Sequence, residues 1–282
     1  MHIPTFTINM SPKSDSRELA LAAAKQIIRL ACENRASHVG GALSVVDVLA
    51  VLYHSVLNID PENPDDARRD RLFYSKGHAC TALYAILYEC GFYDETMLNS
   101  FTKNGSYFTS HVNHKVPGIE LSTGSLGHAL NVACGSALAG KRRNASWKVY
   151  SIVSDGELDE GSNWEAILFA PHHQLDNLTL IVDYNKIQSF GNTQEVLNLD
   201  PLAAKFRAFG WHTEEIDGHD HAAILKMLQQ PVQQAGKPKC IIAHTIKGKG
   251  VPFMEHQLAW HYKSPSETQL AEAWESLENS YK

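Results

Sequence analysis

Short apolar runs alternate with amphipathic stretches along the chain, and this alternation predicts a parallel sheet with helices on both faces. Two apolar runs, residues 149–154 and 178–182, are typical of strands that are buried on both sides. Between them, residues 161–173 carry apolar side chains at mixed helical spacing. Strand, crossover helix and strand form a right-handed βαβ unit, so the carboxyl ends of both strands should meet at one edge of the sheet.

Further elements follow the same pattern toward both ends of the chain. Asp15 with Glu18 forms a capping pattern that predicts the start of one helix, and Ser44 with Asp47 predicts the start of the next. The other expected elements are helices over residues 77–90, 127–140, 201–209, 220–228 and 264–282, and strands over residues 211–216 and 239–244. We therefore expect an α/β fold with a doubly wound parallel sheet, in one domain over residues 1–282 with a C-terminal extension from about residue 262.

Polar residues follow the two central strands where each strand ends. Asp155 and Gly156 come directly after the first strand, and Asn185 follows the second. Mg²⁺ prefers hard oxygen ligands and shares them with phosphate groups, while a glycine lets the backbone approach a diphosphate closely. An isolated Asp-Gly is usually an ordinary turn and an isolated Asn a cap, so the wider sequence decides between these two interpretations.

The wider segment, residues 149–190, resembles the thiamin diphosphate motif of transketolases, in which Gly-Asp-Gly is followed further along by an Asn. Ser154 stands where that family usually has the first Gly. The resemblance implies Mg²⁺, or Ca²⁺ or Mn²⁺ in its place, together with thiamin diphosphate. It assigns metal ligands to Asp155, Asn185 and Ile187, and cofactor contacts to Asp155, Gly156, Glu157 and Asn185.

Four other segments resemble transketolases, so the resemblance covers most of the chain. These are ASHVGGAL at residues 36–43, RDRLFYSKGH at 69–78, IELSTGSLG at 119–127 and GKGVPFMEHQLAWHYKSP at 248–265. By resemblance, they place His38 toward the sugar, His78 on the cofactor diphosphate, Gly124, Ser125 and Leu126 along the cofactor, and His261 at the active centre and the cofactor.

Several departures from the family pattern lie on the side expected to face the sugar. In YFTSHVNHKVPG the family has a His followed by Pro and an acidic residue, and we predict that His111 rather than His114 faces the active centre. His128 and Ala129 replace a common Gln-Gly, and Tyr262 replaces a Gly. The sugar-facing side should therefore differ from the family more than the cofactor side does.

The activity implied by the resemblance is transfer of a two-carbon ketol unit from a ketose to an aldose. His38, His111 and His261 would exchange protons or hydrogen bonds with the sugar oxygens, because imidazole titrates near neutral pH. The 282-residue chain resembles only the first of the three transketolase domains. The activating Glu and the pyrimidine-binding domain are therefore expected on a C-terminal partner subunit, in an α2β2 heterotetramer.

Three questions stay open at this point. Glu160 resembles a family residue at the subunit contact, but an acidic residue that favours a helix N-terminus explains it equally well. The chain could also be the α subunit of a thiamin-dependent 2-oxo acid dehydrogenase. The replacements at Ser154, Ala129 and Tyr262 motivate a third function, a catalytically silent subunit that binds the cofactor.

Composition excludes several classes of partner. Hydrophobic residues make up 44% of the chain and charged residues 20%, which is typical of globular proteins. The net charge is −6 and the basic clusters at residues 68–71 and 141–143 are short, so a nucleic-acid partner is not expected. The five cysteines are scattered, no apolar run is long enough to span a bilayer, and the N-terminus lacks a secretion signal. These features predict a cytoplasmic protein without a membrane anchor.

Overall fold

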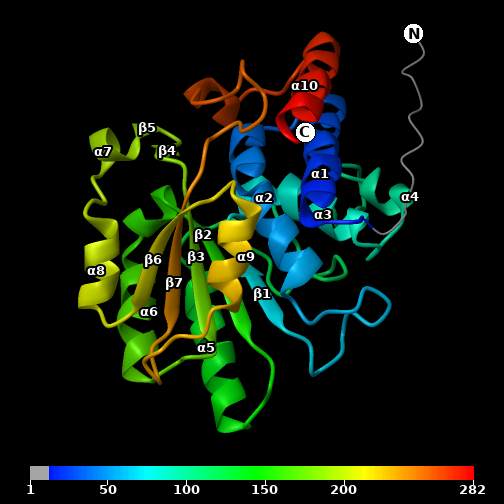
Figure 1. The fold of residues 1–282 in the computed structure, drawn as a ribbon. Coiled ribbons are helices and arrows are strands. Elements are labelled where there is room, and N and C mark those ends of the chain that lie inside the picture. Colours follow the sequence, from blue (N-terminus) through cyan, green and yellow to red (C-terminus); the bar gives the residue numbers. More distant parts are fainter. Residues whose placement is uncertain (1–12) are drawn as a thin grey trace.

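The computed structural model describes residues 13–282, in which a five-stranded parallel sheet has the order β1-β2-β3-β7-β6 (Figure 1). Residues 1–12 lie outside the described residues, so the expectation that the N-terminus lacks a secretion signal is not addressed there. A separate antiparallel pair, β4 with β5, follows the third strand. The strands are β1 (Arg71–Tyr74), β2 (Val149–Ser154), β3 (Leu178–Tyr184), β4 (Ile187–Gln188), β5 (Gly191–Asn192), β6 (His212–Asp217) and β7 (Lys239–His244).

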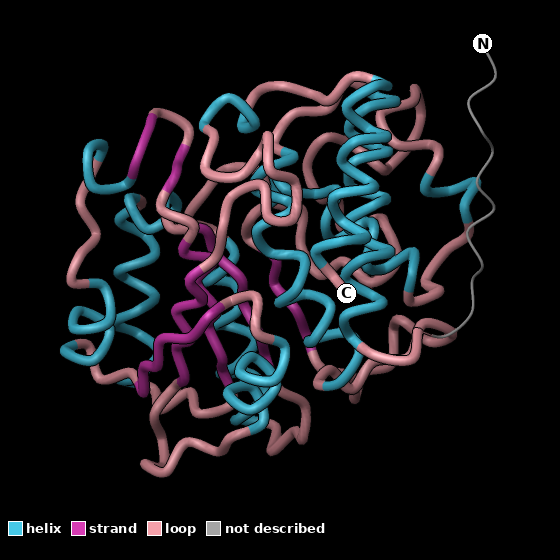
Figure 2. The backbone as a smooth tube through the Cα atoms, turned by 45° about the horizontal axis from the view of Figure 1, so that its top comes forward, coloured by secondary structure: helices cyan, strands magenta, loops and turns pink. Residues whose placement is uncertain are grey.

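Helices cover both faces of the sheet, and Figure 2 shows them surrounding the central strands. The α-helices are α1 (Ser16–Asn34), α2 (Val39–Ser55), α3 (Cys80–Glu89), α4 (Glu95–Leu98), α5 (Ala129–Arg142), α6 (Gly161–His172), α7 (Thr193–Val196), α8 (Leu202–Ala208), α9 (His221–Gln229) and α10 (Glu267–Ser280). Three short 3₁₀ helices, η1 (Gly77–Ala79), η2 (Gly156–Asp159) and η3 (Leu258–His261), lie in the connections.

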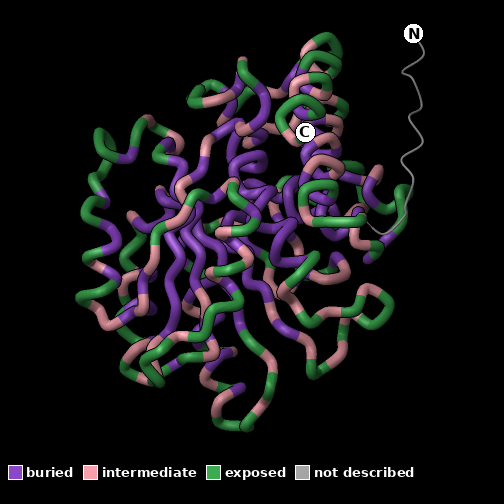
Figure 3. Tube along the Cα trace, in the orientation of Figure 1, coloured by how far each residue is buried: buried purple, intermediate pink, exposed green. Residues whose placement is uncertain are grey.

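Two hydrophobic cores form on opposite faces because successive strand side chains point in opposite directions. Leu72 and Tyr74 of β1 pack in the core shared with α1, α2, α3 and α9, whereas Phe73 packs in the core shared with α5, α6 and α8. The strands β1, β2, β3 and β7 are consequently buried on both sides, whereas the edge strand β6 is only partly buried. Exposed residues concentrate in the peripheral loops and outer helix faces (Figure 3). This arrangement explains the apolar runs in the sequence.

The predicted fold class is confirmed, and most predicted elements agree with the structure to within a few residues. Asp15 caps α1 by accepting hydrogen bonds from the backbone amides of Arg17 and Glu18. The predicted start of the second helix at Ser44 and Asp47 is wrong, because α2 already begins at Val39. Both polar side chains are instead buried within that helix, where they bond to distant residues.

Two features are not predicted by the sequence patterns. The strand β1 has only four residues and lies inside the family-like segment 69–78, for which no strand was predicted. The β4–β5 pair forms in the loop that follows β3. Within residues 13–282, no helix is both long and apolar enough to cross a membrane.

Candidate active site

The carboxyl ends of four neighbouring strands place polar residues side by side. Lys76 follows β1, Asp155 follows β2, Asn185 follows β3 and Thr245 follows β7. The strands are parallel and in register, with Ser154 of β2 opposite Asp183 of β3. Ligand sites of open α/β sheets lie at this edge, so the fold itself brings these groups together.

A cavity of about 190 Å³ opens at this edge of the sheet. All the site residues predicted from the sequence line it except His111, Ser125 and Glu157. The lining residues are His38, Gly41, Lys76, His78, Gly124, Leu126, Ser154, Asp155, Gly156, Asn185, Ile187, Gln188, Ser189, Lys247 and His261.

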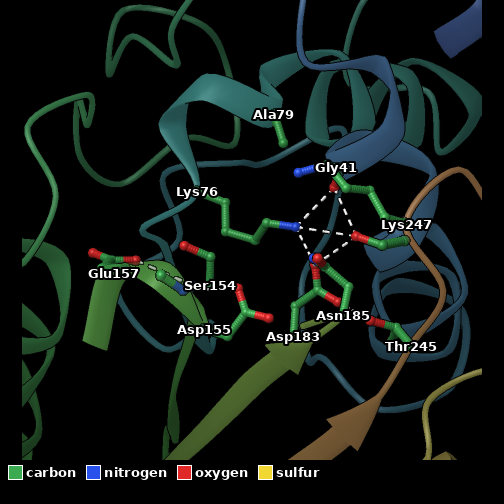
Figure 4. A network of polar contacts seen from close by, with 12 residues as sticks. Gly41, Lys76, Ala79, Ser154, Asp155, Glu157, Asp183, Asn185, Thr245 and Lys247 are labelled. Carbon is green, nitrogen blue, oxygen red and sulfur yellow. Dashed lines mark hydrogen bonds and ion pairs between the residues drawn. The ribbon is translucent and has the colours of Figure 1, made fainter. Parts of the chain in front are cut away.

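Asp155 is buried at the floor of the cavity, and Figure 4 shows its carboxylate beside the network around Asp183. Its Oδ1 accepts a hydrogen bond of 2.7 Å from the Gly156 amide, and its Oδ2 accepts one of 2.5 Å from the Lys186 amide. Burial and the nearby charge of Asp183 raise the pKa of Asp155 to about 6. A cation bound at this carboxylate would relieve both effects.

Asn185 and Ile187 supply two neutral oxygens beside Asp155. The Asn185 Oδ1 accepts a hydrogen bond of 3.1 Å from the Ile187 amide, and the Ile187 carbonyl accepts one of 2.8 Å from Lys247 Nζ. Each of these oxygens has a second lone pair, so both can still coordinate a metal. The described residues hold no group of three or more His, Cys, Asp or Glu that could bind a metal, so a cation here would need oxygens from the diphosphate.

Four imidazole rings gather above this floor. The His38 ring centroid lies 5.3 Å from that of His78, 6.3 Å from that of His111 and 4.8 Å from that of His261. His114 instead bonds to the Ser122 hydroxyl and is exposed. The structure thus places His111, the histidine selected from the sequence, beside the cluster.

Two histidines of this cluster, His38 and His261, are uncharged at neutral pH. Burial, with the charges of His111 and Lys247, lowers the pKa of His38 to about 4. Burial and Lys247 lower the pKa of His261 to about 3. Since Lys247 Nζ lies 3.1 Å from Nδ1 of His261 and acts as the donor, the ring hydrogen of His261 belongs on Nε2.

The lowered pKa of His38 predicts a measurable pH dependence of stability. Because the unfolded chain binds the proton first, the free energy of unfolding should fall as the pH drops from about 6.5 toward about 4. His38→Asn should remove this contribution, so the free energy of unfolding of the wild type, measured by denaturant titration, should fall relative to that of the variant between pH 8 and pH 4. An unchanged difference across this range would contradict the neutral state of His38.

His38 also occupies an uncommon backbone conformation. Its φ is 67°, in the left-handed region, where a non-glycine residue costs of order 1 kcal/mol. The conformation is held by the His38 amide, which donates a hydrogen bond of 2.9 Å to the His261 carbonyl. Such strain often accompanies functional sites, and here it places the two histidines against each other.

Three predicted residues lie outside the cavity wall. One of them, His111, lies beside the histidine cluster as described above. Glu157 is buried and accepts hydrogen bonds from the Ser75 hydroxyl and the Gly127 amide, so its carboxylate stabilises the loops behind the site. Ser125 is exposed between Gly124 and Leu126, which do line the cavity. All the cofactor and metal contacts assigned from the sequence, including those of Glu157 and Ser125, stay predictions.

Sequence reasoning does not select several lining residues, among them Lys76, Gln188 and Lys247. Lys76 stands two residues before His78 within one of the family-like segments, so its position is a usable signal. Lys247 follows β7, and only the strand order places that strand next to β3. No local sequence pattern predicts that β7 lies next to β3.

Gly156, at the cavity wall, packs closely against Gln188. A Cβ atom added to Gly156 would lie 2.7 Å from the Cβ of Gln188, so no larger residue fits there without movement. Ser154, which replaces a family glycine, ends β2 and is not among the described non-glycine residues with positive φ. The replacement therefore carries no left-handed strain.

Comparison with known proteins agrees with this geometry. Residues 20–278 match the family described as transketolase, thiamine diphosphate binding domain. The chain belongs to the transketolase family. Two predictions from the sequence are thereby confirmed. The chain belongs to the predicted family, and it corresponds to the thiamin diphosphate-binding domain of that family.

Relatives of similar length are subunits of transketolases. The chain is 44% identical to 6-deoxy-6-sulfo-D-fructose transketolase subunit SqwG of Clostridium sp. strain MSTE9, covering 86% of this chain and 88% of that protein. It is 41% identical to an apulose-4-phosphate transketolase subunit of Actinobacillus succinogenes, covering 92% and 95%. The solved transketolase of Campylobacter jejuni superposes with a TM-score of 0.85 at 32% identity, covering 94% of this chain and 42% of that chain. Transketolase is thus favoured over the 2-oxo acid dehydrogenase alternative.

The crowding at Gly156 predicts the effect of adding one methyl group at this position. Gly156→Ala should lower the free energy of unfolding by about 1–3 kcal/mol, because Gln188 or the backbone must shift, and should weaken cofactor binding. Gly135→Ala in α5 is the matched control, since its added Cβ meets nothing within 4 Å. Chemical denaturation should show that control to be neutral or stabilised by about 0.5–1 kcal/mol. Equal stability of the two variants would contradict the close approach at Gly156.

Proposed function

We propose that the chain is the cofactor-binding, N-terminal subunit of a split transketolase, which transfers a two-carbon ketol unit from a ketose to an aldose. The observation that carries this proposal is the arrangement around one cavity of a buried carboxylate, two neutral oxygens and a cluster of histidines. In this proposal the whole chain forms one cofactor-binding domain, and α10 packs back on it beside Lys25 of α1.

Asp155, Asn185 and the Ile187 carbonyl would hold Mg²⁺, or Ca²⁺ or Mn²⁺ in its place, with His78 and Lys247 near the diphosphate. When bound, thiamin diphosphate supplies the carbon nucleophile that adds to the ketose carbonyl.

The chain's own contribution is to orient the sugar and to move protons. His38 and His261 are uncharged, and His111 lies beside them. In this proposal the three histidines donate hydrogen bonds to sugar oxygens or accept protons from them.

The partner subunit would carry the pyrimidine-binding domain and the activating Glu. Among the described residues that line the cavity, Asp155 is the only acid, and it is committed to the metal. Large side chains next to the cavity are exposed, with Phe190 at 81% and Tyr262 at 58%. They follow Ser189 and His261 of the cavity wall, so a second subunit that covers the cofactor would also cover them.

An α2β2 assembly would use further exposed apolar residues. Val132 of α5 is 43% exposed and Leu168 of α6 is 60% exposed, so these helices offer a second contact surface. Glu160 is exposed at the start of α6 and its side chain makes no cap hydrogen bond. The exposed Glu160 carboxylate can contact a second subunit and can also interact favourably with the N-terminus of α6.

The five described cysteines are free, and we propose a cytoplasmic location on that basis.

The structure also bears on the silent-subunit alternative. Ser154 carries no left-handed strain, and the Tyr262 hydroxyl donates a hydrogen bond of 2.8 Å to the Ser189 carbonyl at the edge of the cavity. These replacements are accommodated without closing the site, which supports an active enzyme.

The experiment that tests the proposal starts with a pull-down of the tagged chain from its native cell lysate, with mass spectrometry of the co-purifying chain. The purified pair is then assayed for ketol transfer with thiamin diphosphate and Mg²⁺ and without a lipoyl carrier. The first donors to test are the sugars named for its relatives, 6-deoxy-6-sulfo-D-fructose and apulose 4-phosphate. Turnover of a ketose would support the proposal, whereas normal cofactor binding with no turnover of any ketose would establish a silent subunit.

A further inference from the structure

A buried ion pair adjoins the cavity, with Lys76 among the lining residues and Asp183 as its partner (Figure 4). Asp183 of β3 and Lys76 are both fully buried and form a direct salt bridge. The Asp183 carboxylate also accepts hydrogen bonds from the Ser44 hydroxyl at 2.6 Å and from the Thr245 hydroxyl. Burial would raise the pKa of Asp183, but the Lys76 charge and these donors outweigh burial and lower it.

Lys76 is committed to this pair rather than to an anion in the cavity. Its Nζ donates to Asp183, to the Gly41 carbonyl at 2.7 Å and to the Ser44 hydroxyl at 3.4 Å. These bonds use the three donors of an ammonium group. Since a buried charge is costly without a partner, Lys76 compensates the charge of Asp183 through a direct salt bridge, whereas the described residues form no salt bridge with Asp155.

The same carboxylate determines which end of the Asn185 amide faces which neighbour. The Asn185 Nδ2 donates to Asp183 Oδ2 at 3.4 Å, while its Oδ1 accepts from the Ile187 amide at 3.1 Å. A flipped amide would set a donor against a donor and an acceptor against an acceptor. Only the observed orientation keeps the oxygen on the side of Ile187 and the nitrogen on the side of the ion pair.

We propose that the buried Asp183–Lys76 pair is a positioning device for the metal site, which holds the Asn185 amide so that its oxygen, and not its nitrogen, is presented to the cation. The proposal rests on the proposed function, because it takes Asn185 as a metal ligand. Asp183 acts through Asn185, and Lys76 acts by keeping Asp183 neutralised, so that this second carboxylate remains a hydrogen-bond acceptor and does not itself bind the metal. The Asp183 carbonyl supports the same arrangement by accepting a hydrogen bond of 3.2 Å from the Asp155 amide.

The test removes both charges while keeping the shape of the floor. The variant Lys76→Met with Asp183→Leu keeps the branching of residue 183 but offers no acceptor to Asn185. Mn²⁺ affinity, measured by electron paramagnetic resonance on the full chain with its co-purifying partner and with thiamin diphosphate, should fall about tenfold to a hundredfold. The matched control, Ser44→Ala with Thr245→Val, keeps the ion pair and the amide bond, and its Mn²⁺ affinity should stay within about twofold of the wild type.

A rescue separates positioning from general damage to the floor. Adding Asn185→Asp to the charge-free variant should restore Mn²⁺ binding, because a carboxylate presents oxygen in either orientation. An unchanged Mn²⁺ affinity in the charge-free variant, or a loss that Asn185→Asp does not restore, would overturn the proposal.

A measurement on the wild type keeps the proposal falsifiable if the charge-free variant does not fold. The side-chain amide signal of Asn185 can be assigned in nitrogen-15 spectra by its loss in Asn185→Ala. We expect slow hydrogen exchange of this amide in the wild type. Exchange as fast as that of exposed Asn side chains would overturn the proposal. Asp155→Ala distinguishes failure of the proposed function. If that variant still binds Mn²⁺ normally, the metal site itself is misplaced; if it loses Mn²⁺ while the charge-free variant keeps it, only the positioning role fails.

Discussion

Asp155→Ala should abolish Mg²⁺-dependent binding of thiamin diphosphate. Asp155 is the only acid among the described residues that line the cavity, and its carboxylate is buried beside two neutral oxygens. Without Asp155, the cavity offers the cation no charged ligand, so the metal binds weakly. The negative charges of the diphosphate are then not neutralised by the metal. We expect the affinity to fall by more than about a hundredfold, beyond the range typical of residues that only support metal ligands.

Calorimetry on the purified pair should be carried out at pH 8, where Asp155 is ionised because its pKa is about 6. The matched control is Asp176→Ala. Asp176 pairs with Lys141 and precedes β3, so it lies at the opposite edge of the sheet from the cavity. That control should bind the cofactor as the wild type does, and unchanged cofactor affinity in Asp155→Ala would refute the metal site.

His261→Ala should separate binding from turnover. His261 is uncharged, its Nδ1 is occupied by Lys247, and its Nε2 hydrogen is available to a sugar oxygen. Loss of one group that transfers or holds a proton typically lowers turnover by about a hundredfold to ten-thousandfold. Cofactor affinity should stay close to wild type, because Asp155 and Asn185 are untouched.

Steady-state kinetics of the reconstituted pair, together with cofactor titration, would measure both effects. His212→Ala at the start of β6 is a suitable control, since that residue lies at the far edge of the sheet. A variant of His261 that loses its cofactor would show that this residue belongs to the diphosphate rather than to the sugar. Normal turnover would remove it from the active centre.

Much of the fold is readable from local patterns. The strand β7 coincides with its predicted range, and α9 begins after the capping residue Asp220. Those patterns work because a strand buried on both faces needs a continuous apolar run and a helix start needs a side-chain acceptor. The prediction fails at α2, where His38 precedes the helix without a side-chain cap and tertiary contacts replace the usual signal. Ser44 and Asp47 have the composition of a helix start but serve as buried hydrogen-bonding groups.

The sequence by itself placed Asp155, Gly156 and Asn185 at the ends of two neighbouring strands of a βαβ unit, and the resemblance to transketolases marked them as a cofactor site. It also determined the family, through segments spread over most of the chain. The tertiary structure alone decided which residues support those groups. Lys76 and Asp183 are separated by 107 positions, and their pairing follows from the order β1-β2-β3-β7-β6, which no local pattern encodes. The neutral state of His38 and His261 has the same origin, since burial and neighbouring charges lower the pKa of both residues only after the chain has folded.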